Sequence, residues 1–279
     1  MPLGNWLVQK IGSKMTRRRP SHRSFLCDFD RICHEVRPVD VLLIEGRSRL
    51  SRIIQKITLS PWSHSALYIG RLHDIEDPQL RELIQKTYQG PPSDQLLLES
   101  IIGKGTIISS LKYYENDHIR ICRPDGLAYS DAQKVIAHAT QSLGTKYNIR
   151  NFFDLGRFLL KSKLIPPRWR SSLFTYGDNN KPTQDICSAM IAESFMSVGF
   201  PILPHVQKND QGELEFIKRN PKLYAPCDFD YSPYFKIIKY PIFPDKNLTP
   251  YRNLPWVNDL ISNDHAGIVE FKDKKDDET

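Results

Sequence analysis

Two short segments decide the fold of this chain: SPWSHSALYIG at residues 60–70 and TQDICSAMIAESF at residues 183–195. In the first, His64 opens an apolar run of the kind that forms a β-strand. In the second, Cys187 lies where a helix should begin, after polar residues that can cap the helix. A helix start lowers the pKa of a thiol and offers free backbone N–H groups. A histidine strand followed by a cysteine helix therefore indicates a cysteine nucleophile.

Each of these two residues also has an ordinary structural explanation. A buried cysteine often acts as a small hydrophobic residue, and a histidine at a strand end often bonds to a backbone carbonyl. Glu99 helps to decide between a catalytic and a structural role, because it lies in LLLESII with Leu97 and Ile101 on its own face of the strand. A carboxylate buried there needs a partner, and the imidazolium of His64 would be one, as in a catalytic triad. The alternative is an edge-strand glutamate that faces solvent or pairs with Lys104.

The remaining pattern predicts an α+β protein with a mostly antiparallel sheet. Strands are expected at residues 39–46, 64–70 and 118–124, and a hairpin from 95–102 to 106–111. Helices are expected at residues 47–60, 130–143, 146–160 and from Cys187 onward, with Asp77 capping a short helix that starts at Pro78 and Gly144 ending the second helix. The helix at 47–60 should bury Leu50, Ile53, Ile54 and Ile57 on one face. Residues 161–182 read as a surface loop.

The composition is that of an ordinary globular protein. The chain has 279 residues, 40% of them hydrophobic, and a formal charge of +7. No stretch approaches the roughly 18 apolar residues that span a bilayer. Five cysteines are an odd number and include no CxxC pair, which argues against a disulfide framework or a zinc site. We therefore expect at least one free thiol, no cofactor and no metal.

Most of the excess charge lies in the N-terminal arm. Six basic residues precede Asp28, the first acidic one. The arm can form an amphipathic helix suited to an anionic membrane surface, or it can be a solvated or locally docked basic extension. Nucleic acid is disfavoured as a partner, because no groove-reading or base-stacking module follows. The arm lacks the apolar core of a secretory signal, so we expect a cytoplasmic protein, with membrane association through the arm as the open point.

The order of the motifs carries a resemblance. PWSHSALYIG, LLLES before a glycine turn, GTKYNI, CSAMIAESF and APCDFDYSPYF follow one another as in the YiiX/YebB-like branch of the NlpC family of cysteine hydrolases. These are circularly permuted papain-like enzymes in which the histidine strand precedes the cysteine helix. The resemblance implies an antiparallel sheet packed on the nucleophile helix, with Cys187 as nucleophile, His64 as general base and Glu99 orienting it. It also places Tyr147 near the site, where a packing role is expected for this residue.

The resemblance spans about residues 39–239, so it predicts a hydrolase domain at 39–240, a basic extension at 1–38 and a C-terminal extension with a charged tail at 241–279. The implied activity is that of an amidase or esterase with a thioester intermediate. Permuted relatives that resemble lecithin retinol acyltransferase act on lipids, so small-molecule, acylated or lipid-like substrates rank first. A peptidase on peptide or peptidoglycan-like amides and a non-catalytic lipid- or peptide-binding module are the alternatives. Ile186 and the long loop at 161–184 depart from the usual pattern and leave the substrate specificity open. Nothing in the sequence chooses between hydrolysis and acyl transfer.

Overall fold

The computed structural model describes residues 28–145, 187–238, 260–262 and 268–270. Its centre is a six-stranded sheet in the order β4-β3-β2-β1-β5-β8, in which every neighbouring pair is antiparallel. The strands are β1 (Val41–Glu45), β2 (His64–Gly70), β3 (Leu96–Ile101), β4 (Gly105–Ser110), β5 (His118–Pro124) and β8 (Phe235–Ile238). The predicted α+β class with a mostly antiparallel sheet is confirmed, and β2 and the β3–β4 hairpin form where the sequence predicts them.

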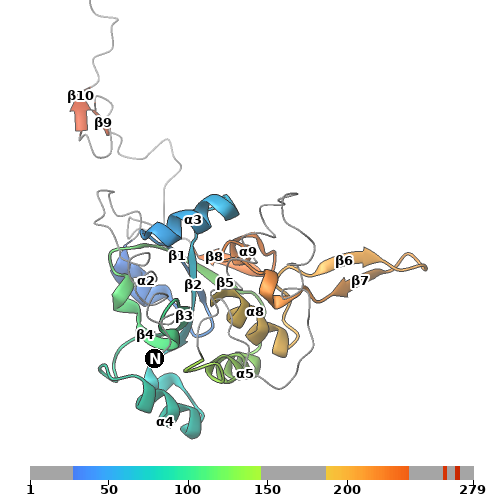
Figure 1. The fold of residues 1–279 in the computed structure, drawn as a ribbon, viewed down its shortest axis with the longest axis horizontal. Coiled ribbons are helices and arrows are strands. Elements are labelled where there is room, and N and C mark those ends of the chain that lie inside the picture. Colours follow the sequence, from blue (N-terminus) through green and yellow to red (C-terminus); the bar gives the residue numbers. More distant parts are fainter. Residues whose placement is uncertain (1–27, 146–186, 239–259, 263–267, 271–279) are drawn as a thin grey trace, which may run out of the picture.

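The helices lie around this sheet (Figure 1). They are α2 (Phe29–Glu35), α3 (Arg49–Thr58), α4 (Pro78–Thr87), α5 (Tyr129–Thr140), α8 (Cys187–Ser197) and the short α9 (Asp228–Tyr231), with 3-10 turns η1 (Leu72–Asp74), η2 (Leu111–Tyr114) and η4 (Pro221–Leu223). None of the helices among the described residues is long and apolar enough to cross a bilayer.

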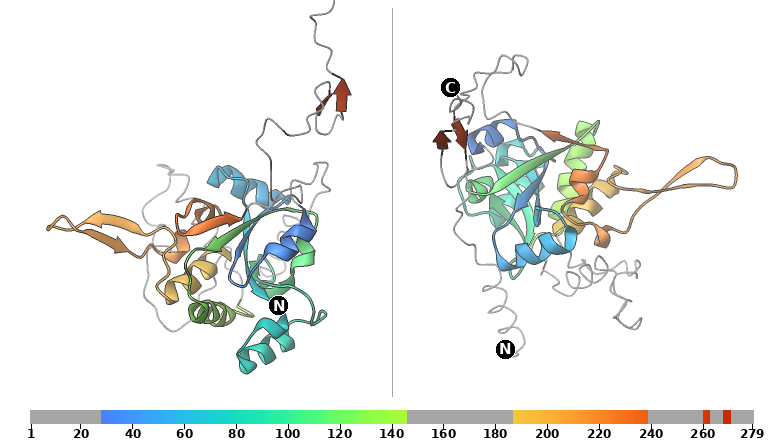
Figure 2. Two further views of the ribbon diagram at one scale, coloured as in Figure 1. Left: turned by 180° about the vertical axis from the view of Figure 1, so that it is seen from behind. Right: turned by 90° about the horizontal axis from the view of Figure 1, so that it is seen from above.

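The two faces of the sheet bury separate hydrophobic clusters, because successive side chains of a strand point to opposite sides. One cluster joins Leu67 of β2 to Ile191 and Phe195 of α8. The other joins Ala66 of β2 to Ile32 of α2. In the right-hand view of Figure 2, α5 and α8 accordingly lie on one side of the sheet and α2 on the other. This arrangement brings the start of α8 to the end of the sheet at which β2 begins.

Three local predictions can be compared directly with the structure. Asp77 caps α4, since its carboxylate accepts hydrogen bonds from the next backbone N–H groups, and Pro78 is the first helical residue, as predicted. The helix α5 ends at Thr140, and a turn separates it from Gly144. The expected inner face of α3 is wrong in one residue: Leu50 is buried, but Ile53 is 42% exposed. Neighbouring residues of a helix point about 100° apart, so Ile53 lies outside the stripe that faces the sheet.

Some elements of the structure were not predicted from the sequence, and some predicted segments lie outside the described residues. The exposed hairpin of β6 (His205–Lys208) and β7 (Leu214–Ile217) projects from the body (Figure 1), and β9 (Leu260–Ser262) pairs with β10 (Ile268–Glu270). The helix α2 lies ahead of the expected domain start at residue 39 and still packs on the sheet through Ile32. The basic arm, the expected helix at 146–160 and the loop at 161–182 fall outside the described residues. The division into three segments, with boundaries after residues 38 and 240, stays a prediction.

Candidate active site

Cys187 is the first residue of α8 and is buried. The helix holds this end in place through apolar packing against the sheet and through Ser188, whose hydroxyl donates to the carbonyl of Tyr224 at 2.6 Å. Ser65 of β2 lies beside the sulfur, and its backbone N–H donates a hydrogen bond to it. The start of the helix is therefore locked against the strand that carries His64.

His64 links the cysteine to a carboxylate. Its Nε2 lies 2.5 Å from Oε2 of Glu99, and the ring also hydrogen-bonds to the sulfur of Cys187. Because Glu99 takes Nε2, Nδ1 is the ring nitrogen that faces the sulfur. The His64 side chain is 19% exposed and the Glu99 side chain is fully buried. All three residues singled out in the sequence are brought together.

Glu99 is surrounded by donors. Besides His64, the hydroxyl of Ser109 donates to Oε1, and the hydroxyl of Tyr114 donates to Oε2 at 2.5 Å. The alternative of an edge-strand glutamate paired with Lys104 is wrong, because β3 is flanked by β2 and β4 and the carboxylate is buried. Ser109 and Tyr114 are not among the site residues predicted from the sequence. The signal for Ser109 is the hairpin register, which places Glu99 opposite Ile107 and so makes Ser109 its diagonal neighbour on the same face.

The electrostatics of the site favour an ion pair. Burial alone would raise the pKa of the Cys187 thiol, but the positive charge of His64 and hydrogen bonds from His64 and Ser65 lower it below its ordinary value. Burial alone would lower the pKa of His64, but the charges and hydrogen bonds of Cys187 and Glu99 raise it to about 10. Burial acts against the charge of Glu99 as well, and its bonds to His64, Ser109 and Tyr114 still hold its pKa below the usual range. The surroundings of the two side chains therefore favour a thiolate at Cys187 beside an imidazolium at His64.

Cys187 differs in this respect from the other cysteines that the structure describes. Burial raises the pKa of Cys33 and Cys122 above the ordinary thiol value, and raises that of Cys227 to about 12. None of these three has a histidine among the groups that act on its pKa. Of the described cysteines, Cys187 is thus the one whose surroundings favour the thiolate form.

A polar network that sequence reasoning missed supports the turn before His64. The indole N–H of Trp62 donates to Asp230 at 3.1 Å, and Arg120 donates to both carboxylate oxygens of Asp230 at 2.8 Å. The guanidinium of Arg120 also lies 4.7 Å from the centroid of the Trp62 ring. This network joins β5 and α9 to the residue two positions ahead of the histidine.

Replacing Asp230 by alanine should therefore lower the free energy of unfolding by about 1–2 kcal/mol, because Trp62 and the partly solvated Arg120 both lose their acceptor. Urea unfolding measures the change. Lys134→Ala, which breaks the exposed ion pair with Asp131, is the control and should cost less than about 0.5 kcal/mol. Equal losses in the two variants would contradict the supporting role of the network.

Among the described residues, no group of three histidine, cysteine, aspartate or glutamate side chains could hold a metal ion. Tyr147, which the resemblance places near the site, lies outside those residues. The site as described consists of a thiol, an imidazole and a carboxylate in one line of contacts.

Comparison with known protein families also indicates a papain-like cysteine enzyme. Residues 35–154 match a family described as the permuted papain-like amidase enzymes YaeF/YiiX, the C92 family. The match includes His64 and Glu99, and α8 lies beyond it. A crystal structure from Escherichia coli O157:H7, titled as the metalloprotein yiiX, is 15% identical, covers 73% of this chain and 96% of its own, and superposes with a TM-score of 0.43. No curated protein matches. The permuted papain-like fold and the cysteine amidase class of enzyme, both predicted from the sequence, are confirmed by this family match over residues 35–154.

Proposed function

We propose that this chain is a cysteine-dependent amidase or esterase that acts on acylated or lipid-like substrates through Cys187, His64 and Glu99. The observation that carries the proposal is the unbroken line of contacts from the sulfur of Cys187 through the ring of His64 to the carboxylate of Glu99. The family description supports an amide as the scissile bond. The basic N-terminal arm and the lipid-directed relatives support an acylated or lipid-like substrate.

In the first half of the reaction, the Cys187 thiolate attacks the substrate carbonyl and forms a C–S bond, and the carbonyl π electrons move to oxygen. Backbone N–H groups at the start of α8 stabilise this oxyanion. When the oxyanion collapses, the C–N or C–O bond breaks and the His64 imidazolium gives its proton to the departing amine or alcohol. A thioester and a neutral imidazole remain.

In the second half, His64 takes a proton from a water molecule that attacks the thioester carbonyl. The C–S bond then breaks, the carboxylic acid leaves, and the thiolate and imidazolium return. Glu99 accepts the Nε2 hydrogen bond throughout, so Nδ1 stays directed at the sulfur and at the groups that replace it. An alcohol or amine in place of the water would make the same enzyme a transferase.

Selective alkylation tests the ion pair on which this mechanism depends. Iodoacetamide at mildly acidic pH should modify Cys187 at least about tenfold faster than Cys33, because a thiolate reacts and a thiol does not. Peptide mapping by mass spectrometry measures both rates in one sample. In His64→Ala the rate at Cys187 should fall to that of an ordinary buried thiol.

Equal rates at Cys187 and Cys33 would favour the binding module, in which Cys187 is a structural residue. Substrate preference distinguishes the proposed amidase or esterase from a peptidase. Hydrolysis of N-acyl amides with peptides left intact supports the proposal, and cleavage of unacylated peptides at a higher kcat/KM would overturn its substrate class.

A further inference from the structure

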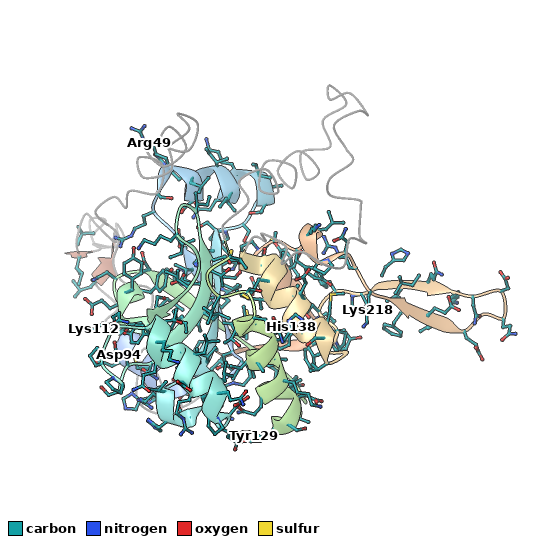
Figure 3. All side chains as sticks on the ribbon, turned by 60° about the horizontal axis from the view of Figure 1, so that its bottom comes forward. Arg49, Asp94, Lys112, Tyr129, His138 and Lys218 are labelled. Atoms are coloured by element: carbon teal, nitrogen blue, oxygen red, sulfur yellow. The ribbon has the colours of Figure 1, made fainter. Side chains whose placement is uncertain are left out.

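The helix α3 turns a basic face to solvent. Arg49, Arg52, Ile53 and Lys56 follow the i, i+3, i+4, i+7 spacing of a single helical face, and all four are exposed. In Figure 3 the side chain of Arg49 extends away from the body of the molecule at one end of this helix. Together with Leu59, which caps the C-terminal end, these residues form what we call the α3 face.

The α3 face carries three positive charges that no acidic residue among the described ones pairs with. The sequence contains no acidic residue between Glu45 and Asp74. None of the three cations of the α3 face forms an ion pair with another residue that the structure describes. In the equally long helix α4, by contrast, Lys86 pairs with Glu82 at 2.6 Å. An anionic partner is therefore the one that the charge of α3 fits.

Leu59 is an unusual residue for its position. Its φ of +51° and ψ of +38° place it in the left-handed region, which residues with a side chain adopt reluctantly and which glycine or asparagine normally fills at a helix end. Its side chain is 88% exposed, so packing within the described protein does not offset this cost. A large apolar group held outward at such a position points to an apolar contact beyond the described residues.

The α3 face lies at the same end of the molecule as the candidate active site. Gln55 holds the end of α3 by donating to the carbonyls of Gly46, at 3.2 Å, and Pro61, at 2.9 Å. The chain then reaches His64 five residues after Leu59. Figure 1 shows α3 at this end and α4 at the opposite end.

The surface beside the α3 face is hollowed. A shallow, open depression of about 390 Å³ is lined by Arg52, Gln55, Lys56, Leu59, Ser60 and Pro61. Two cations and an apolar lip around a shallow depression match a phosphate group with an adjoining acyl chain.

We propose that the α3 face docks on an anionic phospholipid bilayer, with the three cations at the headgroup phosphates and with Ile53 and Leu59 in the apolar side of the interface. A nucleic acid fits less well, because the α3 face has no aromatic side chain on which bases could stack. Docking deepens the proposed function by presenting membrane lipids to Cys187. It does not depend on catalysis, so the two can fail separately.

Vesicle sedimentation of the full chain tests the docking. Wild type should bind mixed phosphatidylcholine and phosphatidylserine vesicles more tightly than pure phosphatidylcholine vesicles, and less tightly as salt rises. Lys56→Glu reverses one charge and should weaken binding to the mixed vesicles about thirtyfold. Lys86→Glu on α4 is the matched control and should bind as wild type. Equal weakening by the two variants would overturn the proposal, because net charge alone would then explain binding.

A second variant separates a bilayer from other anionic partners. Leu59→Asn suits the left-handed backbone and removes the apolar group, so it should leave the midpoint of thermal unfolding unchanged or higher while weakening vesicle binding about tenfold. Unchanged vesicle binding in Leu59→Asn would overturn the proposal and indicate a soluble polyanion as the partner. Cys187→Ala should bind vesicles as wild type whether or not the chain is a hydrolase.

Discussion

Replacing Cys187 by alanine is expected to lower kcat/KM for an acyl amide or ester by at least about 10⁴-fold. Both halves of the proposed reaction pass through a bond to this sulfur, so no partial route remains when it is removed. Acid quench followed by intact-mass measurement should find one added acyl group on the wild-type chain and none on the variant. Steady-state hydrolysis of the same substrate gives the loss in rate.

Two further variants make this result specific. Cys187→Ser keeps the shape of the buried side chain and should be folded but inactive, because a hydroxyl does not form the anion that a thiol with a lowered pKa forms. Cys33→Ala removes a more exposed thiol with a raised pKa and should keep full activity. Turnover by Cys187→Ala within tenfold of wild type would leave no role for the thioester.

The contacts among Cys187, His64 and Glu99 could be predicted because they follow from the free-energy cost of burying individual polar side chains. Strand alternation puts Glu99 among leucines, a buried carboxylate needs a cation, and His64 opens a neighbouring apolar strand. Each of these features involves only a few residues. Tyr114 could not be predicted in the same way, because it lies in the 3-10 turn η2 after β4 and its contact with Glu99 depends on where the fold places that turn.

Surface elements escaped prediction for a different reason. Ile53 continues the apolar run of α3, and the sequence alone cannot tell an apolar residue that packs from one that is held outward. The β6–β7 hairpin exposes Val206 and Phe216 and does not bury one face. An alternation of apolar and polar residues, which marks a strand with one buried face, therefore could not predict these strands. Patterns of hydrophobicity report burial, and these elements do not pack on the core.

Glu99→Gln is expected to lower kcat/KM about a hundredfold. A glutamine carbonyl can still accept from Nε2 of His64, but the negative charge that stabilises the imidazolium is gone. In the wild type the reactive ion pair exists between the lowered pKa of the Cys187 thiol and the raised pKa of His64, about 10. Activity should rise with pH through the first titration and fall through the second, with both values belonging to the coupled pair.

The pH profile of kcat/KM distinguishes this electrostatic role from a structural one. Without the carboxylate charge, the pKa of His64 falls toward its ordinary value of 6.5, so the alkaline limb moves to lower pH. The imidazolium is then less stable beside the sulfur, so the pKa of Cys187 rises and the acid limb moves to higher pH. The active range therefore narrows from both sides, which a packing defect at a fully buried position would not produce. Tyr114→Phe removes one donor and keeps the charge, and should hold both limbs in place at a rate within about threefold of wild type. A Glu99→Gln profile that superimposes on the wild type at reduced height would mean that the carboxylate supports the fold and leaves the charge balance of the pair to Cys187 and His64 alone.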